Sequence, residues 1–150
     1  MCVGLRRRWG GILSVMSVAV LGGALMAARG DRVGAAARTT NDRVYSETQA
    51  KRGKELYTAK CTQCHGETLR GTEYAPPLTG DAFLDVWTNH LLAELMDKTQ
   101  QTMPQNDPGS LDRKQAVDII AYILQVNKWP AGDADLTEGT DVLNAITIGK

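Results

Sequence analysis

Two cysteines and a histidine stand within five consecutive residues, in the run Cys61-Thr62-Gln63-Cys64-His65. This is the C-x-x-C-H pattern of covalent haem attachment. Each thiol can add to a haem vinyl group, and the spacing places both sulfurs against one edge of the ring. The imidazole that follows can bind the iron as proximal ligand when an acceptor orients its second nitrogen. The run therefore predicts one haem c and its iron, held by Cys61, Cys64 and His65.

Two cysteines separated by two residues can also form a disulfide, half of a zinc site or a redox dithiol. A zinc site needs two further ligands, whereas the only other histidine is His90 and the third cysteine is Cys2, at the start of the chain. A redox dithiol would follow a strand, and the pattern before Cys61 is helical. These alternatives stay open, but the adjacent histidine favours haem.

The sixth position of the iron could be filled by Met103, Met96 or His90, or could stay open. Met96 and His90 fall within a helical pattern, which favours packing or surface roles. Met103 precedes Pro104, and this proline ends the helix and holds an extended loop that suits a strap across the ring. Met103 is therefore the expected distal ligand. Trp87 could donate its indole N–H to a haem propionate, although its spacing suits the core equally well.

The first helix is expected from about Glu47 to Lys60, directly before the cysteines. Ser46 can cap this helix, and Gln49 at the third position completes the S-x-x-Q form of the capping box. Gly53 costs about 1 kcal/mol in a helix relative to alanine. It is therefore either incidental or permits close approach of another helix.

Two more helices are expected after a loop over residues 65–80, which is rich in glycine and proline. Apolar residues at intervals of four predict one middle helix, capped by Asp81 and ending before Met103. Ser110 is expected to cap the last helix, which ends before Pro130. No segment alternates with period two. The predicted fold class is therefore all-α, with three main helices joined by long loops. Loops of this length are unusual unless something fills the space that they enclose.

Residues 1–37 are interpreted as an export segment and a linker. Three arginines precede a stretch without charge from residue 9 to residue 28, which is typical of a signal peptide. Cleavage is expected between about residues 28 and 38. The alternative is a retained anchor, because about 20 apolar residues can span a membrane. A folded domain is predicted over residues 38–135 and a C-terminal tail over residues 136–150.

The predicted folded part is small and acidic. From residue 38 onward the chain has 12 Lys and Arg against 16 Asp and Glu, a net charge of −4. A protein that binds nucleic acid needs a basic face, so nucleic acid is not an expected partner. One Phe and 5% aromatic residues are little from which to build a core. An apolar group such as haem would help to fill it.

From about residue 46 to residue 129 the sequence resembles the class I cytochromes c. The resemblance covers more than half of the chain and rests on the runs Gly53-Lys54-Glu55-Leu56-Tyr57, Cys61-Thr62-Gln63-Cys64-His65-Gly66, Ala75-Pro76-Pro77-Leu78, Thr102-Met103-Pro104 and Asp118-Ile119-Ile120-Ala121-Tyr122-Ile123. The segment around Pro108 and the last helix are similar to small cytochromes that accompany quinoprotein dehydrogenases.

The resemblance implies the class I cytochrome c fold, in which three main helices and loops surround one haem. It implies that Gly53 and Tyr57 lie where the first helix crosses the last one, near Tyr122. It also implies that the Pro76 carbonyl orients the proximal histidine and that Met103 is the distal ligand.

An iron with both axial positions filled by protein is expected to cycle between Fe(III) and Fe(II), so the chain is expected to carry electrons rather than to be an enzyme. The expected partners are redox proteins that meet it transiently, a dehydrogenase as donor and an oxidase or another cytochrome as acceptor. The expected location is the periplasm, or the periplasmic face of the inner membrane if the first segment is retained. An open sixth position would instead give a peroxidase or a gas sensor, and a retained anchor would suit a subunit that tethers a dehydrogenase.

Overall fold

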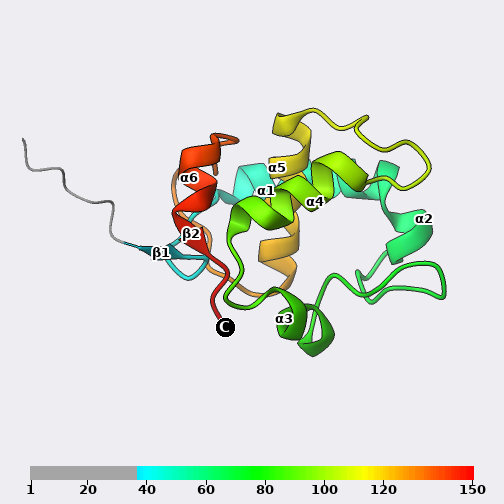
Figure 1. Cartoon of the computed structure of the whole chain (residues 1–150), viewed down its shortest axis with the longest axis horizontal. Coiled ribbons are helices and arrows are strands. Elements are labelled where there is room, and N and C mark those ends of the chain that lie inside the picture. Colours follow the sequence, from blue (N-terminus) through cyan, green and yellow to red (C-terminus); the bar gives the residue numbers. More distant parts are fainter. Residues whose placement is uncertain (1–36) are drawn as a thin grey trace, which may run out of the picture. The chain divides into compact units, whose positions relative to one another are not determined.

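Six helices and a pair of two-residue strands make up the computed structural model, which describes residues 37–150 (Figure 1). The predictions for the export segment lie outside the described residues. The three longest helices confirm the all-α prediction: α1 (Glu47–Lys60), α4 (Leu92–Thr102) and α5 (Arg113–Val126). The shorter elements are α2 (Thr62–His65), α3 (Asp81–Trp87), α6 (Thr140–Asn144), β1 (Arg38–Thr39) and β2 (Ile146–Thr147). Among residues 37–150, no helix has the length and apolar character needed to cross a bilayer.

Helix α1 has the predicted bounds, but only half of its predicted capping box. The Ser46 hydroxyl accepts a hydrogen bond from the Gln49 backbone N–H at 3.0 Å. The Gln49 side chain does not reach back to the start of the helix. Its amide donates to the Leu136 carbonyl at 2.8 Å and accepts from the Leu136 N–H at 2.7 Å. Gln49 therefore joins α1 to the C-terminal segment.

Helices α1 and α5 cross with their backbones in contact. A Cβ atom on Gly53 would lie 1.8 Å from the Asp118 carbonyl oxygen, so only glycine fits at this crossing. One turn further on, the rings of Tyr57 and Tyr122 have their centroids 5.5 Å apart. Arg52 donates to both carboxylate oxygens of Asp118 at 3.0 Å. The predicted close approach at Gly53 and the predicted neighbourhood of Tyr57 and Tyr122 are confirmed.

The prediction of one continuous middle helix is wrong, because residues 88–91 separate α3 from α4. Asn89 has a φ of 70°, which ends regular helix geometry. The Asn89 N–H donates to the Ile148 carbonyl, and the Ile148 N–H donates to the His90 carbonyl, both at 2.9 Å. The C-terminal segment thus supplies the hydrogen bonds that a helix would otherwise make. The apolar residues keep their spacing of four across this break because α3 and α4 pack against the same core.

Two predicted helix caps are also wrong. Gly80, with a φ of 76°, is the N-cap of α3, and Asp81 lies in the first turn, where its charge suits the helix dipole. Asp112 rather than Ser110 caps α5. The Asp112 carboxylate accepts from the Gln115 N–H at 2.7 Å, and the Gln115 side chain accepts from the Asp112 N–H at 3.1 Å. Asp112 and Gln115 form a complete capping box.

Replacing Asp112 by alanine is expected to lower the free energy of unfolding by about 1 kcal/mol, because the Gln115 N–H loses its partner. Urea unfolding of the purified holoprotein measures the change. The matched control is Ser110→Ala, since Ser110 is exposed and lies two residues earlier. Equal losses of stability in the two variants would contradict the assignment of the cap.

Residues 136–150, predicted to be a tail, pack onto the rest of the described chain. β2 pairs with β1 in parallel, with Arg38 opposite Ile146 and Thr39 opposite Thr147 (Figure 1). Four side chains of this segment are buried: Leu136, Leu143, Ile146 and Ile148. Arg113 of α5 also donates to the Glu138 carbonyl at 2.8 Å. The segment completes the core and braces the turn between α3 and α4.

Candidate functional site

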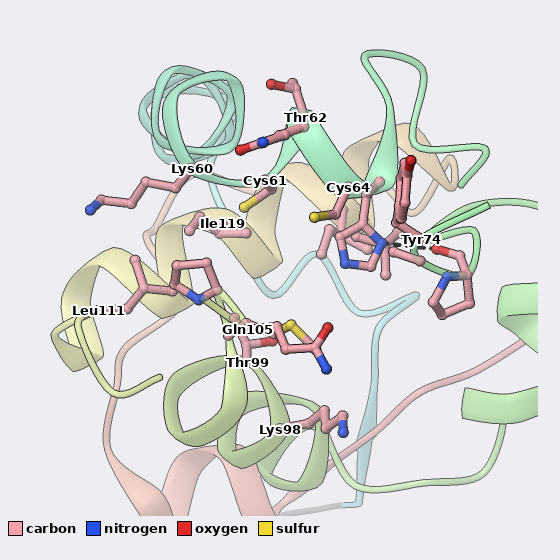
Figure 2. A pocket seen from close by; sticks show the side chains of 18 of the residues that line it. Lys60, Cys61, Thr62, Cys64, Tyr74, Lys98, Thr99, Gln105, Leu111 and Ile119 are labelled. Carbon is pink, nitrogen blue, oxygen red and sulfur yellow. Dashed lines mark hydrogen bonds between the residues drawn. The ribbon is translucent and has the colours of Figure 1, made fainter. Parts of the chain in front are cut away.

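A cavity of about 630 Å³ brings the predicted site residues together (Figure 2). Its wall is formed by the end of α1, by α2, by the loop that follows, by α3 and α4, by the loop after α4 and by α5. All six residues predicted for the cofactor site line it: Cys61, Cys64, His65, Pro76, Trp87 and Met103.

The two cysteines stand at the junction of α1 and α2. Cys61 is the C-cap of α1, and its N–H donates to the Tyr57 carbonyl at 2.8 Å. The short turn of α2 then places Cys64 beside it, and Figure 2 shows both sulfur atoms directed toward the cavity. Cys61 and Cys64 do not form a disulfide with each other. The helical turn thus presents two sulfurs along one edge of the cavity.

Burial raises the pKa of the Cys61 thiol to about 11. The nearby Lys60 opposes this shift, but desolvation is the larger effect. Redox dithiols work through a thiolate whose pKa lies below that of a free cysteine. The environment of Cys61 therefore counts against a redox dithiol.

His65 is buried and has a fixed ring orientation. Its Nδ1 lies 2.8 Å from the Pro76 carbonyl oxygen. A carbonyl can only accept a hydrogen bond, so Nδ1 carries the proton and donates it. In the neutral ring the lone pair then belongs to Nε2, which is the nitrogen available to a metal.

Hydrogen bonds that were not predicted fix the backbone around the histidine. The Tyr57 hydroxyl donates to the Gly66 carbonyl at 2.6 Å, and burial, the main cause, raises the pKa of this phenol. The Thr72 hydroxyl donates to the Cys64 carbonyl at 2.5 Å, and the Gly71 N–H donates to the His65 carbonyl at 3.0 Å. These contacts form only when the loop is folded, and nothing in the sequence around Thr72 indicates them.

Of the three side chains considered for the sixth position of an iron, only Met103 lines the cavity. Met103 is the C-cap of α4, with an extended backbone at φ −119° and ψ 149°. Met96 is completely buried in the core. His90 is half-exposed and its Nδ1 lies 2.5 Å from a carboxylate oxygen of Glu94. The structure thus separates Met103 from the other two.

Trp87 lies between the cavity and the core, so its position suits both a contact with a haem propionate and a role in core packing. Its half-buried ring lines the cavity, and its centroid lies 6.3 Å from that of Phe83 in the core. The His90 ring also lies near Trp87, with the two ring centroids 5.8 Å apart.

The chemistry of the cavity wall fits a haem. The wall includes the apolar side chains Phe83, Leu95, Leu111, Ile119 and Ile123. The volume lies in the range of about 300–1,000 Å³ that is usual for cofactor sites. Within residues 37–150, no three Asp, Glu, Cys or His side chains come together as they would around a bound metal ion. Two thiols, an imidazole and a thioether around an apolar space instead suit a metal that brings its own macrocycle.

Comparisons with known proteins agree with this chemistry. The family described as cytochrome c oxidase, cbb3-type, subunit III matches residues 48–123. The thiosulfate dehydrogenase of Psychrobacter arcticus is 33% identical, over 59% of this chain and 32% of that protein. The chain thus spans about a third of the length of this relative. The crystal structure of the sulfane dehydrogenase SoxCD from Paracoccus pantotrophus has a similar fold, with a TM-score of 0.53 and 19% identity over 73% of this chain and 62% of that one.

The family match spans just over half of the chain and includes α1, the cysteine–histidine run, α4 and most of α5. The predicted resemblance and the predicted class I cytochrome c fold are therefore confirmed. The chain belongs to the family of the cbb3-type cytochrome c oxidase subunit III and is a c-type cytochrome, with covalently bound haem c and a role in electron transfer.

Proposed function

We propose that the chain is a carrier of single electrons with one haem c, attached through thioether bonds to Cys61 and Cys64. His65 and Met103 are the proposed axial ligands. When bound, haem supplies a reversible one-electron change between Fe(III) and Fe(II). The observation that supports this assignment is that all four side chains line one cavity.

The protein's part in this function is to hold the ligands still and to limit access of water. The Pro76 carbonyl keeps the proton on Nδ1 of His65, so that the ring offers the same nitrogen in both redox states. The apolar side chains of the wall, such as Phe83 and Ile119, would exclude water from the faces of a bound haem that they cover. If His65 and Met103 both bind the iron, no position would be vacant for a substrate, which favours a carrier over an enzyme.

The proposed place of work is the periplasm, and the support for it is the export segment in the sequence. The proposed partners are redox proteins, a dehydrogenase as donor and an oxidase or cytochrome as acceptor. Contacts between such proteins are small and short-lived.

Met103→Ala tests the proposed ligand set. The variant is expected to keep its covalent haem, to lose the ferric charge-transfer absorption of methionine ligation completely and to gain binding of carbon monoxide in the ferrous state. Its reduction potential is expected to fall, because a thioether ligand raises the potential.

The control for this experiment is His90→Ala, since His90 lies outside the cavity. The control is expected to keep the methionine signature. An unchanged spectrum in Met103→Ala, or carbon monoxide binding by the unaltered protein, would instead support an open-site enzyme or sensor.

The similarity to a thiosulfate dehydrogenase favours a second candidate, in which the chain is the haem-bearing part of a thiosulfate-oxidising enzyme. Anaerobic mixing of the oxidised holoprotein with thiosulfate separates the two. A carrier is expected to stay oxidised until a donor enzyme is added. Reduction by thiosulfate alone would favour the enzyme.

A further inference from the structure

The Pro76 carbonyl, which accepts the hydrogen bond from His65, lies on a loop. Contacts between this loop and other parts of the chain must therefore set its position. Pro76 is exposed and belongs to the segment between α2 and α3, which has neither helix nor strand. Within this segment, the Leu78 N–H donates to the Leu69 carbonyl at 2.7 Å. A Cβ on Gly71 would lie 2.9 Å from the Pro76 carbonyl carbon, so the loop folds tightly against itself. These contacts shape the loop but do not join it to a long helix.

The Asn127 side chain joins this loop to α5. Its amide N–H₂ donates to the Leu78 carbonyl and to the Ile123 carbonyl, both at 2.9 Å. Its amide oxygen accepts from the Gly80 N–H at 3.1 Å. The amide thus binds the backbone two and four residues after Pro76, and its partner Leu78 lies 49 residues away in the sequence.

We infer that Asn127 is a positioning residue for the proximal side of the haem, acting on His65 through Leu78 and Pro76. The inference rests on the proposed function, because it matters only if His65 binds the iron. A hydrogen bond from Nδ1 to a carbonyl makes the imidazole a stronger electron donor. A stronger donor favours Fe(III). Loosening the loop weakens the hydrogen bond and therefore raises the reduction potential.

A purely structural role for Asn127 is the alternative that the test must exclude. Asn127 is the C-cap of α5, and its bond to the Ile123 carbonyl would serve as a helix cap without any effect on His65. Asp112 caps the other end of the same helix and has no hydrogen bond to the loop over residues 66–80. Asp112→Ala is therefore a control that weakens α5 without touching the proximal loop.

The experiment compares Asn127→Ala with Asp112→Ala in the holoprotein. In the reduced state, proton NMR measures how fast the His65 Nδ1 proton exchanges with solvent, and a redox titration measures the potential. Asn127→Ala is expected to exchange this proton faster and to have a higher potential than the unaltered protein. Asp112→Ala is expected to be less stable but to match the unaltered protein in both readouts.

Asn127→Asp provides a second, nearly isosteric variant. It keeps an acceptor for the Gly80 N–H but puts an oxygen against the Leu78 carbonyl, so it is expected to speed exchange of the Nδ1 proton. Its added negative charge lowers the potential on its own, so only the exchange rate is compared for this variant. Unchanged exchange in both variants of Asn127, an unchanged potential in Asn127→Ala, or equal shifts in Asp112→Ala would overturn the inference. A failure of the proposed function is distinguishable, because the unaltered protein would then lack a thioether-linked haem or an exchange-protected Nδ1 proton.

Discussion

Gly53→Ala is expected to lower the free energy of unfolding by about 2–4 kcal/mol, although alanine is the better helix former by about 1 kcal/mol. The new methyl group would lie 1.8 Å from the carbonyl oxygen of Asp118 and 2.5 Å from its carbonyl carbon. Both atoms belong to the backbone of α5, so no side chain can turn away to make room. The two helices must separate, which also pulls apart the contact between Tyr57 and Tyr122.

Chemical denaturation of the holoprotein, followed by far-ultraviolet circular dichroism, measures this loss. Gly139→Ala is the matched control, because a Cβ there meets its nearest neighbour only at 3.8 Å. This control is expected to change stability by less than about 1 kcal/mol, the usual size of an effect at a helix N-cap. A Gly53→Ala variant as stable as the unaltered protein would show that α1 and α5 do not cross as closely as described.

The double variant Cys61→Ala/Cys64→Ala is expected to lose all covalently attached haem. Both cysteine sulfurs at the cavity are then gone, while His65 and Met103 can still bind an iron. Any porphyrin that stays bound should therefore be extractable with acid acetone. Without haem, the apolar side chains of the cavity wall lose the group that they pack against, at roughly 25 cal/mol per Å² of apolar surface left in water. A domain is stable by only about 5–15 kcal/mol, so the variant without haem is expected to be much less stable.

Acid-acetone extraction and intact mass measure the loss, in cells with a working maturation system. Gln63→Ala is the control from the same run, because Gln63 is exposed and lies between the two cysteines. The control is expected to carry one haem per chain. Porphyrin that still resists extraction from the double variant would mean that other atoms attach it.

The features predictable from the sequence are those whose causes are local. Ser46 and Gln49 mark the start of α1, and its end at the cysteines follows from the same helical pattern. Gly53 signals a close helix crossing because a glycine in mid-helix otherwise only destabilises it. The motif at Cys61 also fixes its own geometry, since one turn of helix brings the sulfurs to the same side.

The features that could not be predicted depend on partners distant in sequence. The break between α3 and α4 needs Ile148, whose backbone bonds to Asn89 and His90. Nothing in the spacing of Trp87 and Leu91 indicates that partner. The cap of α5 is an exception, because its cause is local: Asp112 and Gln115 form the capping box, and the prediction placed the cap two residues too early, at Ser110.

The side chains that support the proximal histidine show the same limit. Asn127 reaches Leu78 and Gly80 across almost 50 residues of chain, so its bonds exist only once α5 and the loop are folded together. Thr72 and Tyr57 likewise act through backbone carbonyls, which any sequence provides.

The pyridine haemochrome spectrum of the purified protein tests the central claim most directly, because it distinguishes thioether-linked haem from haem with free vinyl groups. The predicted result is the spectrum of haem c with two thioether bonds, at one haem per chain. A colourless protein from cells with an intact maturation system, or the spectrum of haem with free vinyl groups, would contradict the claim.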